Sequence, residues 1–169
     1  MKKICIIILT ASALCACKPA DHRDAPAAQT TVPITGAFGW TLGQKVPPEF
    51  ELFQGWGWSD DNNHSNEPFS NIQGSCLLDR TVYEIIGIAD RSQASVIMGA
   101  LETKYGPGGF GYTTNGEFET WVNGDCQVRT ERFNNIVTVT YKNMALEAKH
   151  SDEMSDRRNA ASAKLSGHL

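Results

Sequence analysis

The sequence predicts an α+β fold in which one helix covers an antiparallel sheet of about five strands, in the order β-β-α-β-β-β, with one disulfide. A stripe of apolar residues with helical spacing, between positions 94 and 105, predicts the helix. Alternating apolar residues around the turn signal Asn123-Gly124 predict antiparallel strands. The chain has 169 residues, of which 41% are hydrophobic and 20% charged, and this balance predicts one soluble domain with a single core.

The strands before the helix are expected within residues 51–89. Residues 51–58 have the composition of a short strand, and the polar residues 59–74 predict a long surface loop. From Cys76 onward the pattern predicts a hairpin that turns at Asp79-Arg80. Its second strand, 81–89, is apolar on both faces and is therefore expected in the centre of the sheet.

The helix has clear signals at both ends. Asp90 is the expected N-cap, with Gln93 three residues later, and Gly106-Pro107 is the expected stop. Its apolar stripe consists of Ala94, Ile97, Met98, Leu101 and Tyr105. Three antiparallel strands are then expected at 118–122, 126–131 and 136–141.

The first 17 residues have the pattern of an export signal. Lys2 and Lys3 precede an apolar run, 4–9, that is shorter than the roughly 20 residues needed to span a membrane. The following Leu14-Cys15-Ala16-Cys17 resembles the lipobox of bacterial lipoproteins. The resemblance implies that residues 1–16 are a signal peptide and that Cys17 carries acyl chains such as palmitate, which anchor the protein to a membrane.

The domain limits and the cysteine count follow from this reading. We expect a lipidated flexible linker at 17–35, the α+β domain at 36–148 and a polar tail at 149–169. Cleavage would leave 13 basic and 19 acidic side chains, a net charge of −6, so anchoring is expected to depend on the acyl chains. Once Cys17 is lipidated, only Cys76 and Cys126 remain in the domain. An even pair of cysteines in an exported protein predicts a disulfide.

The expected location is the cell envelope, on a membrane facing the periplasm. Lys18 follows the lipobox cysteine, whereas aspartate there is the inner-membrane retention signal of enterobacterial lipoproteins, so the outer membrane is favoured. Residues 92–141, with a helix ending in Tyr105-Gly106-Pro107 before three strands, are loosely similar to small outer-membrane assembly lipoproteins of the SmpA/OmlA type. No functional residue is carried over from that family.

The remaining residues support three hypotheses for function. The leading one is a non-enzymatic envelope protein that binds another protein as an accessory subunit or inhibitor. The second is a peptidoglycan or glycan binder that stacks sugars on Trp56 and Trp58, although a place for these aromatics in the core is the favoured interpretation. The third is a weak periplasmic hydrolase. Its candidate residues are Asp60, His64 and Glu67, and Asp61 belongs to the same polar loop.

Several other classes of function have no support in the sequence. The charge distribution lacks the basic patch of a nucleic-acid binder. No histidine has a second ligand at metal-binding spacing, so neither a metal nor a cofactor is expected. Glu117 and Glu119 form a carboxylate pair, but spacing alone does not argue for glycoside cleavage.

Overall fold

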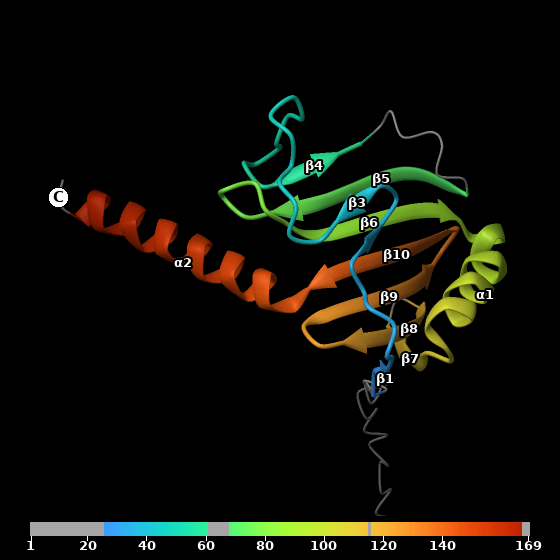
Figure 1. The fold of residues 1–169 in the computed structure, drawn as a ribbon. Coiled ribbons are helices and arrows are strands. Elements are labelled where there is room, and N and C mark those ends of the chain that lie inside the picture. Colours follow the sequence, from blue (N-terminus) through green and yellow to red (C-terminus); the bar gives the residue numbers. More distant parts are fainter. Residues whose placement is uncertain (1–25, 61–67, 115, 167–169) are drawn as a thin grey trace, which may run out of the picture.

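The computed structural model describes residues 26–60, 68–114 and 116–166 (Figure 1). They form a mixed eight-stranded sheet, a two-stranded sheet and two α-helices. The large sheet contains β1 (Ala28–Gln29), β4 (Gly57–Ser59), β5 (Phe69–Cys76), β6 (Val82–Asp90), β7 (Gly109–Thr113), β8 (Gly116–Asn123), β9 (Cys126–Phe133) and β10 (Ile136–Asn143). The small sheet pairs β2 (Gly36–Ala37) with β3 (Trp40–Thr41), and the helices are the short 3-10 helix η1 (Arg91–Gln93), α1 (Ala94–Tyr105) and α2 (Met144–Ser166).

The prediction of a five-stranded antiparallel sheet is wrong. The strand order is β1-β8-β9-β10-β6-β5-β4, and β7 also pairs with β8. Strand β1 pairs with β8 in parallel, which makes the sheet mixed. Strand β5 falls largely in the stretch predicted as a loop, because its polar residues Ser70, Asn71 and Gln73 hide the strand pattern. The short strands β1, β4 and β7 have too few residues to show an alternation.

Helix α1 covers one face of the sheet and confirms the predicted apolar stripe. All five residues of that stripe are buried. Asp90 Oδ1 accepts a hydrogen bond from the backbone N–H of Ser92 at 2.8 Å, as expected of the N-cap, and Gly106 ends the helix at φ +83°. On the sheet face that carries the helix, one row of buried residues crosses six paired strands. The row is Trp121, Val128, Tyr141, Ile85, Gly74 and Trp58.

The segment between β1 and β4 crosses the sheet and completes the core (Figure 1). Ile34 and Val46 are buried, and Trp40 stacks on Trp58 with ring centroids 4.1 Å apart. Arg80 holds this segment, because its guanidinium donates hydrogen bonds to the carbonyls of Val46, Pro47 and Phe50 at 2.9, 2.6 and 2.8 Å. Strand β1, which belongs to the large sheet, therefore lies inside the range predicted as a linker.

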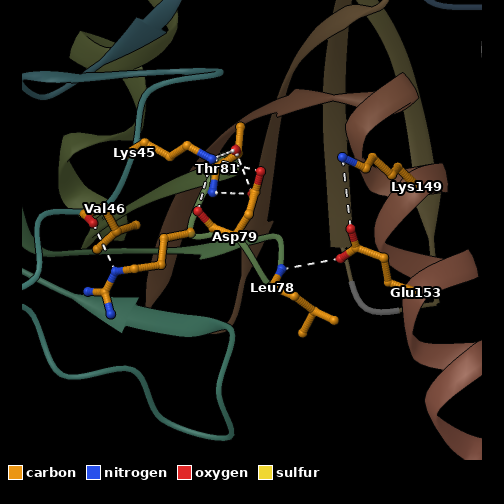
Figure 2. A network of polar contacts seen from close by, with 8 residues as sticks. Lys45, Val46, Leu78, Asp79, Thr81, Lys149 and Glu153 are labelled. Carbon is orange, nitrogen blue, oxygen red and sulfur yellow. Dashed lines mark hydrogen bonds and ion pairs between the residues drawn. The ribbon is translucent and has the colours of Figure 1, made fainter.

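Figure 2 shows a second attachment of this segment and one attachment of α2. Lys45 Nζ contacts Asp79 Oδ2 and Thr81 Oγ1, both at 2.7 Å, at the turn between β5 and β6. Glu153 of α2 accepts a hydrogen bond from the backbone N–H of Leu78 at 3.2 Å. The β5–β6 turn thus joins the N-terminal segment to the C-terminal helix.

Helix α2 occupies most of the range predicted as a polar tail. Near its start, the His150 ring lies 5.6 Å from the ring of Trp56 and 5.1 Å from that of Tyr83. Lys142 bridges the sheet and the helix, with Nζ 3.0 Å from Glu84 and 2.7 Å from Glu147. Side chains 156–164 are exposed, and the helix projects away from the sheet (Figure 1). Its first half is therefore packed, and its second half makes little contact with the domain.

The predicted disulfide between Cys76 and Cys126 is also wrong, since both cysteines are free. Cys76 ends β5 and Cys126 begins β9, and the strands β6 and β10 lie between them. Strands are spaced at about 4.8 Å, so three spacings place the two residues roughly 14 Å apart, beyond the ~7 Å limit for Cα atoms of a disulfide. Burial raises the pKa of both thiols, which makes them poor nucleophiles at neutral pH.

Candidate functional site

The two tryptophans predicted to form a platform do not share a surface. Trp58 has 0% of its surface exposed and lies in the core, stacked on Trp40. Trp56 is half-buried and faces His150 of α2. The two rings separate because β4 begins only at Gly57, so strand alternation does not extend back to Trp56.

Of the other predicted binding residues, Asp60 is the one that lies in the described part of the chain. Asp60 accepts a hydrogen bond from Trp40 Nε1 at 3.1 Å, so the structure gives it a role in fixing a core indole. Asp61, His64 and Glu67 lie outside the described residues, as does the predicted lipidation site Cys17. Within residues 26–60, 68–114 and 116–166, no three His, Cys, Asp or Glu side chains are grouped as a metal site would require. In the same ranges, no helix is long and apolar enough to cross a membrane.

An apolar pocket opens beside α1, at residues where no sequence motif predicts a binding site. Its volume is about 220 Å³. Leu101 and Ile97 of α1 form one wall, and Val139 and Tyr141 of β10 line it from the sheet. The other lining residues are Phe38, Pro68, Phe69, Val96, Ala100 and Lys104.

One wall of this pocket is held in a strained turn. Phe38 has φ +58° and Gly39 has φ +81°, and together they link β2 to β3 as a two-residue hairpin turn of type I′. A phenylalanine at positive φ is unfavourable, so the fold must compensate by packing the ring. The Phe38 ring lies 4.5 Å from Phe69 and 6.0 Å from Tyr141, over the bare backbone of Gly87, where a Cβ would clash with it.

A second, polar depression lies at the β7–β9 side of the sheet. Its volume is about 440 Å³. Tyr112, Glu117 and Arg132 are directly paired across β7, β8 and β9, so their side chains stand in one row on the face that carries α1. Arg91 of η1 and Asn134 of the β9–β10 turn lie on its rim, and its remaining lining residues are Thr113, Thr114 and Gly116. We call this depression the polar cleft.

Glu119 lies beside the polar cleft, two residues farther along β8 than Glu117, and its pKa is raised. Its side chain is only 12% exposed, and its Oε1 is 3.5 Å from Nη2 of Arg132. Burial raises the pKa of Glu119; the neighbouring Arg132 opposes this, and the carboxylates of Glu102 and Glu117 add to it. The i,i+2 spacing of Glu117 and Glu119 was the only sequence signal for this group, and it became informative once β8 placed both on one face.

No protein-family model matches this chain, and neither the curated proteins nor the solved structures contain a match to it. The function therefore has to be argued from the residues themselves.

Proposed function

We propose that this protein is a lipid-anchored, non-enzymatic component of the bacterial cell envelope that binds another protein through the apolar pocket beside α1. The anchor is supported by the lipobox-like Leu14-Cys15-Ala16-Cys17 after a short apolar run. The binding role is supported by the pocket, which is the observation that carries the proposal.

The size of the pocket favours a protein partner. A volume of about 220 Å³ is below the roughly 300 to 1,000 Å³ of pockets for drug-sized ligands and cofactors. It has room for one large apolar side chain, which is how hot-spot residues are seated at protein interfaces. Its rim is also apolar and accessible, because Val96 is 63% exposed and Ala100 is exposed. A partner residue that entered the pocket would therefore bury this rim as well.

The anchor can be tested directly. Replacing Cys17 by Ser should abolish labelling with a clickable fatty acid and release the protein from the membrane fraction, because a hydroxyl is a much weaker nucleophile than a thiolate. Labelling that persists in this variant would refute the anchor, and it would leave the pocket proposal unaffected.

The binding role can be tested by photocrosslinking in intact cells. A photoreactive phenylalanine analogue at Val96, on the pocket rim, should give one adduct of discrete mass. The same analogue at Ser95, which is exposed on α1 but does not line the pocket, should not. Ala100→Trp fills the pocket and should abolish the Val96 adduct, whereas the matched Ser95→Trp should leave it unchanged. Equal adducts from both positions, or a Val96 adduct that survives Ala100→Trp, would overturn this proposal.

A further inference from the structure

The polar cleft combines three kinds of side chain at close quarters. The aromatic Tyr112, the carboxylate of Glu117 and the guanidinium of Arg132 occupy adjacent strands, and neighbouring strands are about 4.8 Å apart. The cleft volume of about 440 Å³ lies within the range of small-molecule sites, in contrast to the apolar pocket. This cleft is therefore large enough for a polar ligand the size of one or two rings.

The charged groups in the cleft retain hydrogen-bonding capacity. Arg132 Nε is 3.4 Å from Glu117 Oε2, and its Nη2 is 3.5 Å from Glu119 Oε1. Strong charge-assisted hydrogen bonds are shorter, about 2.7 to 2.9 Å. Consistent with this, Nε of Arg132 is buried and has no hydrogen-bond partner among the described residues. The buried Nε itself is out of reach of a ligand, but the Arg132 and Glu117 side chains are 22% and 39% exposed. A carboxylate accepts hydrogen bonds and a guanidinium donates them, so the exposed atoms of this pair can bind ligand hydroxyl groups, which do both.

Arg91 adds a positive charge that the described part of the chain does not neutralise. Its Nη1 donates a hydrogen bond to the backbone carbonyl of Asn134 at 2.9 Å, and it forms no ion pair with a described carboxylate. The hydrogen bond fixes the guanidinium at the rim of the cleft. An anionic group on a ligand would pair with it.

The aromatic wall of the cleft is exposed yet held in position. Tyr112 is 61% exposed and Phe110 is 42% exposed. Their rings are 4.9 Å apart at an interplanar angle of 86°, an edge-to-face contact that orients the Tyr112 ring. The Tyr112 ring therefore offers a fixed apolar surface beside charged groups.

We propose that the polar cleft binds a saccharide ring that carries a carboxylate. The apolar C–H face of the sugar stacks on Tyr112, its hydroxyl groups bond to Glu117 and Arg132, and its carboxylate pairs with Arg91. This inference concerns different residues from the apolar pocket, so either can fail without the other.

The test uses the full-length protein in detergent, with three probes titrated by calorimetry and by NMR. N-acetylmuramic acid has both the ring and the carboxylate, N-acetylglucosamine has the ring alone, and D-lactate has the acid alone. We expect N-acetylmuramic acid to bind at least five-fold more tightly than either of the others. Tyr112→Ala should weaken its binding at least ten-fold, and Arg91→Gln should remove its advantage over N-acetylglucosamine.

Phe53→Ala is the matched control, since Phe53 is 50% exposed and lies at the opposite edge of the sheet, next to β4. It should leave binding unchanged. Equal binding of D-lactate and N-acetylmuramic acid would reveal a simple anion site and overturn the proposal. So would the absence of saturable binding at millimolar N-acetylmuramic acid, or an equal loss of binding in Phe53→Ala.

Discussion

Two buried tryptophans offer a sensitive test of the core, because they differ in one hydrogen bond. Trp58 and Trp121 are both 0% exposed. Trp121 Nε1 donates to the carbonyl of Gly106 at 2.7 Å, whereas Trp58 Nε1 has no partner among the described residues. Replacing each by Phe removes the same atoms, so the loss of packing is similar in both variants.

The hydrogen bond then determines which variant is less stable. Trp121→Phe leaves the Gly106 carbonyl without the N–H that Trp121 donates to it, which costs roughly 1 to 3 kcal/mol. Trp58→Phe removes an N–H whose burial without a partner already cost the protein roughly 1 to 3 kcal/mol. The free energy of unfolding should therefore be lower for Trp121→Phe than for Trp58→Phe by about 2 to 6 kcal/mol.

The measurement is urea unfolding followed by circular dichroism, with unchanged m-values as the control for an intact fold. Trp58→Ala should cost about 3 to 5 kcal/mol, as expected for a core tryptophan. Equal stabilities of the two Phe variants would show that the Trp58 N–H has a partner in solution. A Trp58→Ala variant of nearly wild-type stability would show that the ring does not belong to the core.

Three further predictions concern contacts that join distant segments. Arg80→Lys should lower the free energy of unfolding by about 2 to 4 kcal/mol, because one ammonium cannot reach the three carbonyls that the guanidinium binds; thermal and urea unfolding measure this. Lys142→Met should lower the free energy of unfolding by about 1 to 3 kcal/mol, because it leaves Glu84 and Glu147 without their ion-pair partner. Lys149→Met should lower it by less than about 0.5 kcal/mol, because the Lys149–Glu153 pair is 3.9 Å long and lies on the exposed surface of α2. Arg132→Met should raise the pKa of Glu119 further, as followed by carboxyl-carbon NMR. Because the folded-state pKa of Glu119 is already above its ordinary value, its ionisation destabilises the fold, and this destabilisation should diminish as pH falls through that pKa.

Local signals explain what the sequence predicted correctly. The stripe of α1, its Asp90 cap and its Gly106 stop all fall within about 17 residues, so their interactions are short in sequence and visible as a pattern. The hairpin turn between β8 and β9 also lies close to the predicted position, but its two central residues are Gly124 and Asp125, because Asn123 still pairs with Cys126; of these two, only Gly124 has a positive φ, of +57°.

Strand order explains most of what the sequence could not predict. The disulfide prediction rested on the even number of cysteines in an exported chain, but two strands separate Cys76 from Cys126 in the sheet. Pairing between β10 and β6 brings together residues about 50 positions apart, and no local pattern encodes that choice. The polar cleft was missed for the same reason, because Tyr112, Glu117 and Arg132 become neighbours only through the pairing of β7, β8 and β9.

The position of β1 changes the geometry of the proposed anchor. Ala28 pairs with Trp121, so the sheet begins eight residues earlier than the predicted domain start at Gly36. From Cys17 to Ala28 the chain can span at most about 36 Å. Because the β8 end of the polar cleft lies some five residues along the strand from Trp121, or about 17 Å, and β1 lies one strand spacing of about 4.8 Å from β8, the cleft would reach no farther than roughly 60 Å from the acylated cysteine. If both proposals hold, a glycan that is itself fixed in place must lie within that distance of the acylated cysteine, whereas a soluble sugar can reach the cleft by diffusion.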